Sequence, residues 1–375
     1  MNQPNNKKLF GHIEVPLKRI HIELTNICNF DCVFCPKDEM KRPPGFMDVD
    51  LAKRIIDTVK TNDICEKITF HVMGEPTLHP KFFEILDYTR MQDVNVGLTT
   101  NGTGLTGKAG KRLIDYDLHQ IDVSLQTPDE KSFQLRKAGN ISFDDYVEGV
   151  LGFLSAYNIR EKKTTFKFRF LNTRFCGSDM LKKMDSQNIN STNRDLQKTF
   201  RHWAERIYDL LGVNGTERER ALEKIGKLAS YRWNVVQVHD NVFFETYILT
   251  SWEDASANSD IRDAWSGHCF GMRDHFGILY NGDVVLCCMD FNGKTSIGNL
   301  NDQSLEEILS TPELKDIIEG FKKNRIVHPY CKKCLGSKTF TGWIFKPFGY
   351  TLSQTVLKPF FYRQSSIWKQ DPRES

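Results

Sequence analysis

RIHIELTNICNFDCVFCPKDEM, residues 19–40, begins as a short alternating strand and continues into three cysteines, Cys28, Cys32 and Cys35. Their spacing is CxxxC followed by CxxC. A disulfide uses two thiols, and a structural zinc site usually has four ligands. Three thiolates instead suit a [4Fe–4S] cluster in which one iron has no protein ligand. A zinc site completed by a distant residue such as His71 is the alternative.

Strands and helices alternate over the first two-thirds of the chain. Short β-branched or alternating runs predict strands at 19–25, 67–73, 95–101, 120–126, 164–172 and 233–240. Helical patterns lie between most of them, at 48–61, 79–92, 106–117, 142–158 and 194–212. This order predicts an α/β fold, a partial (β/α)6 barrel of the TIM type, which places its chemistry at the carboxyl ends of the strands. The three cysteines follow the first strand, at that end.

One region interrupts the alternation. Residues 174–193 are polar and loop-like, and 214–232 resemble an extra charged helix. We interpret 174–232 as a solvated surface insertion. A substrate-covering or dimerising element is the alternative.

The pattern changes after about residue 260. Residues 275–291 predict a β-hairpin that turns at Asn281-Gly282, and 304–324 predict a helix opened by a capping box of Ser304 and Glu307. A small α+β module is therefore expected here. The predicted divisions are an N-terminal extension (1–17), the barrel (18–260), the module (261–340) and an aromatic, basic tail (341–375).

Composition narrows the class of protein. The formal net charge of the 375 residues is +3, which favours neither nucleic acid nor an acidic partner. The N-terminus has no apolar run suited to a signal peptide, and no stretch approaches the length of a membrane span. We expect a cytoplasmic protein with reduced thiols.

Ten cysteines in a reducing compartment need a use other than disulfides. Five of them, Cys269, Cys287, Cys288, Cys331 and Cys334, lie between residues 269 and 334 and indicate a second metal site. Neighbouring residues of a strand point to opposite sides, so only one of Cys287 and Cys288 is expected to face that site. A zinc ribbon is the alternative for this group. The isolated Cys65 and Cys176 are interpreted as small buried hydrophobes.

The triplet, with aromatic Phe34 before its last cysteine, resembles the signature of the radical S-adenosylmethionine superfamily. The resemblance implies that Cys28, Cys32 and Cys35 hold a [4Fe–4S] cluster whose open iron binds S-adenosylmethionine. One electron from that cluster then cleaves the sulfonium and yields a 5′-deoxyadenosyl radical, which abstracts hydrogen from a substrate.

Further motifs of that superfamily have counterparts here. HVMGEP (71–76) resembles its GGE-type motif, with Met73 in place of the first glycine, and implies contacts to the S-adenosylmethionine amino group. The ends of the third and fourth strands and the following helix imply further contacts to that ligand. The implied S-adenosylmethionine-binding residues are Gly74, Glu75, Pro76, Asn101, Ser124, Gln126 and Arg136. Arg169, on the fifth predicted strand, could pair with a carboxylate or be a surface charge.

The second cysteine group resembles the SPASM/twitch module that follows the barrel in many of these enzymes. The resemblance implies one auxiliary [4Fe–4S] cluster held by Cys269, Cys287, Cys331 and Cys334. Cysteine spacing and order are most similar to those of dehydrogenases that oxidise 2-deoxy-scyllo-inosamine.

This resemblance implies a radical oxidoreductase that acts on a sugar, aminosugar or cyclitol, with flavodoxin or ferredoxin as reductant. Either dehydrogenation or epimerisation fits. For the return of hydrogen the candidates are Cys176 and Cys288, with Arg169 as a further catalytic candidate. A peptide-modifying SPASM enzyme and a non-enzymatic iron–sulfur or zinc protein are the alternatives.

Overall fold

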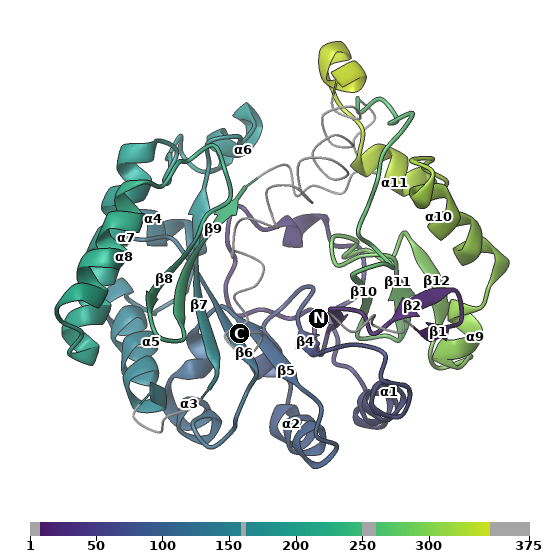
Figure 1. Ribbon diagram of the computed structural model, residues 1–375, viewed down its shortest axis with the longest axis horizontal. Coiled ribbons are helices and arrows are strands. Elements are labelled where there is room, and N and C mark those ends of the chain that lie inside the picture. Colours follow the sequence, from purple (N-terminus) through teal and green to yellow (C-terminus); the bar gives the residue numbers. More distant parts are fainter. Residues whose placement is uncertain (1–7, 159–162, 250–259, 346–375) are drawn as a thin grey trace, which may run out of the picture.

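A ten-stranded sheet dominates the computed structural model, which describes residues 8–158, 163–249 and 260–345. Most of the predicted tail (341–375) lies outside the described residues. The strand order is β12-β11-β10-β3-β4-β5-β6-β7-β9-β8 (Figure 1). Six neighbouring strands are parallel and form the predicted partial barrel: β3 (Arg19–Ile22), β4 (Ile68–Phe70), β5 (Val96–Thr100), β6 (Gln120–Gln126), β7 (Thr165–Asn172) and β9 (Val242–Ile248).

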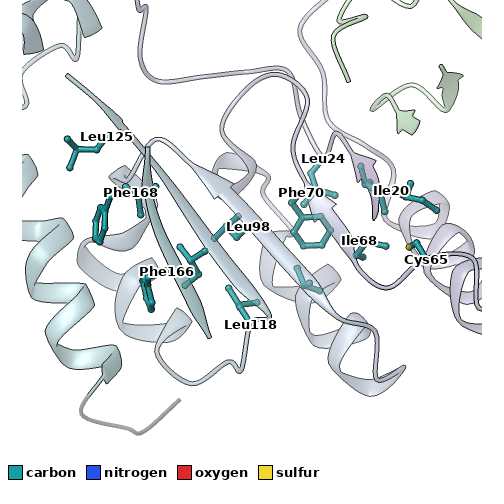
Figure 2. Close-up of a cluster of buried hydrophobic side chains, with 14 of the residues drawn as sticks. Ile20, Leu24, Cys65, Ile68, Phe70, Leu98, Leu118, Leu125, Phe166 and Phe168 are labelled. Carbon is teal, nitrogen blue, oxygen red and sulfur yellow. The ribbon is translucent and has the colours of Figure 1, made fainter. Parts of the chain in front are cut away.

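Helices cover the outer face of this sheet (Figure 1). The larger crossover helices are α1 (Val49–Asn62), α2 (Phe82–Met91), α3 (Gly107–Leu113), α5 (Phe143–Asn158) and α7 (Asn193–Leu211), and a short α4 (Glu130–Phe133) follows β6. Alternate strand residues such as Ile20, Ile68 and Phe70 form the core under these helices (Figure 2). The side chains between them, such as His21 and Thr69, point to the opposite, inner face.

The sixth parallel strand differs from the prediction. Residues 233–240 were expected to continue the barrel, but β8 (Val235–His239) runs antiparallel at the edge of the sheet. It turns through Asp240 and Asn241 into β9, which pairs parallel with β7. Two adjacent apolar runs joined by a two-residue turn form a hairpin, and only the second run enters the barrel.

The insertion lies beside the last barrel strands. Residues 174–193, expected to be a loop, contain the short helix α6 (Ser178–Lys183). The extra charged helix predicted within 214–232 is present as α8 (Thr216–Gly226) and packs along α7.

The C-terminal module continues the barrel sheet. Its strands are β10 (His275–Ile278), β11 (Asp283–Val285) and β12 (Ser296–Asn299), and β10 pairs parallel with β3. The hairpin turn at Asn281-Gly282 is as predicted, with Gly282 at a φ of 93°. The N-terminal strands β1 (Lys8–Phe10) and β2 (Ile13–Val15) form a hairpin whose His12 N–H donates to the Leu309 carbonyl.

The single helix predicted over 304–324 is two helices. These are α9 (Leu305–Leu309), which opens with the predicted capping box, and α10 (Pro312–Lys322). Pro312 stands at the first position of α10, where its missing N–H is tolerated, and it cannot continue the preceding helix. The last helix, α11 (Pro329–Cys334), carries the CKKC motif.

Candidate active site

A cavity of about 240 Å³ opens at the carboxyl ends of the barrel strands and is lined by both N-terminal and C-terminal segments. The structure places ten of the predicted site residues on its wall: Cys28, Cys32, Cys35, Gly74, Asn101, Ser124, Gln126, Arg136, Arg169 and Cys288. Cys176 lies elsewhere, packed against an apolar cluster that includes Met180 and Leu171. Glu75 and Pro76 are buried behind the wall.

The three-cysteine loop follows β3 and is held by backbone hydrogen bonds. The N–H groups of Asp31 and Val33 donate to the carbonyls of Arg136 and Leu135. Burial raises the pKa of the Cys28 thiol and raises that of Cys35 to about 12. Without a cation these thiols keep their protons, and a metal centre that binds them releases those protons.

Arg136 puts a fixed positive charge beside the triplet. Its side chain is 1% exposed, and Nη1 donates to the carbonyls of Ser124 and Leu125, both at 2.7 Å. The guanidinium lies over the Phe30 ring, 4.7 Å from its centroid. Burial opposes the charge, but interaction with Cys32 raises the pKa of Arg136. Its buried Nε has no hydrogen-bond partner, so the wall offers an unused donor to an anionic group.

Glu75 organises the loop after β5. Its carboxylate accepts hydrogen bonds from the Thr77 N–H and hydroxyl, from the Thr100 hydroxyl, and from the Asn101 N–H at 2.6 Å. Burial raises the pKa of Glu75, and these four donors oppose that rise. The Asn101 side chain, held in this way, donates to Asn29 Oδ1 at 2.8 Å and approaches Cys28 Sγ at 3.6 Å. Glu75 therefore shapes the cavity wall by holding Asn101 in position.

Two backbone irregularities shape the wall. Gly74 has a φ of 74°, and a Cβ there would lie 2.3 Å from the Thr25 carbonyl oxygen, so a side chain would collide with the loop before the triplet. The register of β6 shifts between Val123 and Gln126, and Gln126 has a φ of 54°. Both Ser124 and Gln126 line the cavity as a result.

The far wall carries polar groups from β4, β7 and β9. Arg169 pairs with Asp122 at 2.8 Å and with Glu245 at 3.3 Å. These carboxylates raise the pKa of Arg169 despite its burial. Burial lowers the pKa of His71 to about 4 and raises that of Tyr247 to about 12, so at neutral pH the first is a neutral imidazole and the second a protonated phenol.

The second cysteine group lies beside the cavity but does not line it. Cys269 precedes β10, Cys287 follows β11, and Cys331 and Cys334 lie on α11. The four come close enough to interact electrostatically: Cys269 and Cys334 both raise the pKa values of Cys287 and Cys331, after the larger effect of burial. Backbone N–H groups of Gly271 and Met289 donate to Cys269 and Cys287, each at 3.3 Å.

The spacing of the thiols within each group argues against a single zinc ion. Zn–S bonds of 2.3 Å place tetrahedral sulfurs about 3.8 Å apart. Among the described residues, one set of three His, Cys, Asp or Glu ligand atoms lies within 4.8 Å of one another, and it contains neither the triplet nor any three of the second group. The wider spacing suits a multi-iron cluster, and the donors at Arg136 and Asn101 suit its negative charge.

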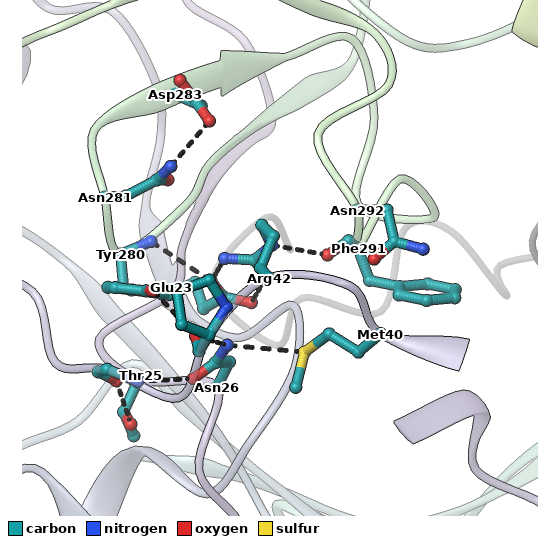
Figure 3. Close-up of polar contacts among 12 residues, drawn as sticks. Glu23, Thr25, Asn26, Met40, Arg42, Tyr280, Asn281, Asp283, Phe291 and Asn292 are labelled. Carbon is teal, nitrogen blue, oxygen red and sulfur yellow. Dashed lines mark hydrogen bonds and ion pairs between the residues drawn. The ribbon is translucent and has the colours of Figure 1, made fainter. Parts of the chain in front are cut away.

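A buried ion pair joins the three-cysteine loop to the C-terminal module (Figure 3). Arg42 pairs with Glu23 through two hydrogen bonds of 2.7 and 2.8 Å, and its Nε donates to the Phe291 carbonyl. Glu23 also accepts from the Tyr280 N–H, and Arg42 lies over the Tyr280 ring. Burial raises the pKa of Glu23, which Arg42 opposes. The loop and the module hairpin are therefore fixed relative to each other.

Sequence reasoning missed several wall residues. Tyr247 lies on β9, a strand that was not predicted. Lys37 and Met289 also line the cavity but belong to no sequence motif that would have identified them. His71 was considered only as a zinc ligand. Its position at the carboxyl end of β4, two residues after Thr69 on the same face, was the signal available for it.

Two family profiles match the chain. The radical SAM superfamily profile covers residues 22–165, and the SPASM iron–sulfur cluster-binding domain profile covers residues 269–335. None of the helices in the described ranges has both the length and the apolar composition needed to cross a membrane.

One curated relative and two solved structures illustrate the similarity. The tungsten-containing aldehyde ferredoxin oxidoreductase cofactor-modifying protein of Pyrococcus furiosus is 31% identical over 109 residues, which are 29% of this chain and 31% of that protein. SuiB of Streptococcus suis, bound to precursor peptide SuiA, aligns with a TM-score of 0.51 at 15% identity, over 83% of this chain and 68% of that one. BtrN in complex with AdoMet and 2-DOIA aligns with a TM-score of 0.47 at 17% identity, over 85% and 89%.

Proposed function

Because the chain belongs to the radical SAM superfamily and carries a SPASM iron–sulfur domain, we propose that it abstracts hydrogen from a C–H bond of a hydroxylated small molecule. A sugar, aminosugar or cyclitol is the proposed substrate class, and two-electron oxidation of an alcohol is the proposed reaction. One observation carries the proposal: the same cavity is bordered by the three-cysteine loop and, through Cys288 and Met289, by the segment next to Cys287.

The cysteine groups are assigned different tasks in this proposal. The triplet would hold a [4Fe–4S] cluster with an open iron, and Cys269, Cys287, Cys331 and Cys334 would hold an auxiliary cluster. When bound, the first cluster and S-adenosylmethionine supply the hydrogen-abstracting radical, and the auxiliary cluster accepts an electron. Arg136 and Asn101 would stabilise the negative charge on the triplet side. Such an enzyme needs an electron donor, for which flavodoxin or ferredoxin is our candidate.

The far wall provides groups for the alcohol. In the oxidation, the carbinol carbon loses one hydrogen atom and one electron, and its hydroxyl loses one proton, which leaves a carbonyl. His71 is neutral and can accept the hydroxyl hydrogen, while Arg169 and Tyr247 can donate to substrate oxygens. Epimerisation at the same carbon would need hydrogen to return, and of the two cysteines considered for this, Cys288 is the one on the wall.

A peptide substrate is the second candidate. Its support is the fold similarity to SuiB, whose solved structure holds a precursor peptide. Pockets for drug-sized ligands are roughly 300–1,000 Å³. The cavity here is about 240 Å³, and in this proposal it also receives S-adenosylmethionine, so the substrate panel rather than the volume separates the two candidates.

The test is anaerobic reconstitution with iron and sulfide, followed by reduction in the presence of S-adenosylmethionine. Formation of 5′-deoxyadenosine tests the radical chemistry. A panel of carbon-deuterated cyclitols and aminosugars then tests the substrate class: deuterium in 5′-deoxyadenosine together with a ketone product supports alcohol oxidation. Solvent hydrogen at the inverted carbon would indicate epimerisation. Deuterium transfer from peptides but from none of the polyols would overturn the small-molecule proposal.

A further inference from the structure

Three metal-ligating side chains that belong to neither predicted cluster meet on the inner face of the sheet, beside the second cysteine group. They are His21 on β3, His275 on β10 and Cys288 after β11, and their ligand atoms lie within 4.8 Å of one another. Within the described parts of the chain this is the one set of three His, Cys, Asp or Glu side chains gathered so closely.

The pairing of two strands creates this set. β3 and β10 are parallel neighbours in which His275 stands opposite Arg19, so His21 and His275 are diagonal neighbours on one face, with ring centroids 5.4 Å apart. Cys288 joins them from the turn that follows β11, while the neighbouring Cys287 interacts with Cys269 and Cys334 of the second cysteine group.

His21 is held in an orientation that suits metal binding. The Thr69 hydroxyl lies 2.6 Å from His21 Nδ1 and is also placed to donate to the Ile20 carbonyl at 3.4 Å. When the hydroxyl donates to that carbonyl, it accepts from Nδ1–H, and the lone pair of the imidazole is then on Nε2. Metal-ligating histidines usually have one ring nitrogen fixed by such a partner.

Burial favours the neutral, ligating form of both imidazoles. It lowers the pKa of His21 well below its ordinary value and that of His275 to about 4. Metal binding therefore displaces no proton from either ring at neutral pH.

The surrounding charges are mixed. Arg19 acts on all three side chains, and its positive charge opposes a cation. Burial raises the pKa of the Cys288 thiol, and Arg19 only partly offsets that rise. Arg169 is paired with Asp122 and Glu245, and Asp274 acts on His275 with the opposite sign to Arg19. A metal ion that binds Cys288 displaces its proton, and the resulting thiolate together with these carboxylates can offset the charge of a divalent ion.

We propose that His21, His275 and Cys288 form a mononuclear zinc site whose fourth position opens to the cavity. Two imidazoles and one thiolate are a ligand set typical of zinc, and three protein ligands leave one position for water or substrate. Bonds of 2.0–2.3 Å require ligand atoms about 3.3–3.8 Å apart, so the set closes by up to about 1.5 Å around the ion. Since Cys288 lines the cavity, a substrate hydroxyl or carboxylate oxygen can occupy the fourth position.

The site is tested on the holoenzyme with both cysteine groups loaded with iron. After incubation with one equivalent of Zn²⁺ and removal of excess by a chelator, zinc and iron are quantified, and zinc-edge X-ray absorption reports the ligands. We expect one retained zinc per chain with two imidazole nitrogens and one sulfur, at unchanged iron content. Failure to retain zinc, or retention with three or four sulfurs and loss of iron, would overturn the proposal.

Variants make the assignment specific. Cys288→Ala should remove the sulfur from the zinc spectrum, and His275→Gln should abolish zinc retention. Thr69→Val, which alters only the partner of His21, should weaken retention by about 10–100-fold. Cys176→Ala is the matched thiol control and should retain zinc as the unmodified chain does. If His275→Gln loses iron or helicity, the Thr69→Val variant decides the question. Zinc retention by Thr69→Val equal to that of the unmodified chain would refute the proposal.

Discussion

The two cysteine groups differ in what surrounds them. The triplet has side-chain partners, a buried guanidinium at Arg136 and the amide of Asn101, besides backbone N–H groups, and all three of its thiols border the cavity. The second group has backbone N–H donors at Gly271 and Met289 and borders no part of that cavity. The comparison shows one group whose three thiols border the cavity and one group that lies outside it.

The largest expected effect is from removing one thiol of each group. Cys28→Ala should abolish 5′-deoxyadenosine formation, because the triplet would then have two ligands. Cys331→Ala should keep that activity but lose substrate oxidation, because the acceptor for the second electron is damaged. Product analysis and iron quantification check both, with Cys65→Ala as the thiol control. If both variants lost 5′-deoxyadenosine formation equally, the two cysteine groups would not have the different functions proposed for them.

The ion pair that joins the two regions should have the next largest effect. Arg42→Met leaves Glu23 buried without its cation and should lower the free energy of unfolding by about 3–5 kcal/mol. Urea unfolding measures this, and Lys53→Met, in the exposed Lys53–Glu84 pair, should change little. The double variant with Glu23→Leu should recover part of the loss. A cost no greater than that of the exposed pair would show that the regions are not held by this contact.

A smaller effect is expected from a change at Glu75. It tests whether this residue stabilises the loop near the triplet or contacts S-adenosylmethionine directly. Glu75→Gln replaces an acceptor facing the Asn101 N–H with a possible donor and should cost about 1–3 kcal/mol in unfolding free energy. Chemical denaturation measures the stability of the variant and of the unmodified chain, and calorimetric titration measures how each binds S-adenosylmethionine. Unchanged stability with lost binding would mean that Glu75 contacts the ligand directly, contrary to its placement behind the wall.

The smallest effect concerns pH. The pKa of His71 is about 4 in the folded chain and about 6.5 when unfolded, so the unfolded chain takes up the proton first as pH falls. The contribution of His71 is fully present above pH 6.5 and decreases between 6.5 and 4. From pH 7.5 to 5.5 the unfolding free energy should fall by about 1 kcal/mol through this residue. His71→Gln should remove that part of the pH dependence in urea titrations. If the unfolding free energy of the variant falls with pH as steeply as that of the unmodified chain, a residue other than His71 causes the dependence.

The fold and much of the cavity wall could be predicted because they depend on local pattern. Alternation of strands and helices gave five of the six barrel strands near their observed positions, and short cysteine spacings identified both groups. The sixth strand was misplaced because two apolar runs separated by Asp240 and Asn241 do not reveal which run joins a sheet. The helix over 304–324 was predicted as one although Pro312 marks a boundary.

What the sequence determined by itself is the chemistry available: three thiols without a fourth, four more with a closing CxxC, and a run of parallel strands to hold them. Only the tertiary structure decided how these groups meet. It placed Glu75 behind the wall, removed Cys176 from the cavity, and brought His21 and His275, more than 250 residues apart in sequence, onto adjacent strands. Such contacts depend on strand pairing between distant segments, and the energy of that pairing is not encoded in any one stretch of the chain.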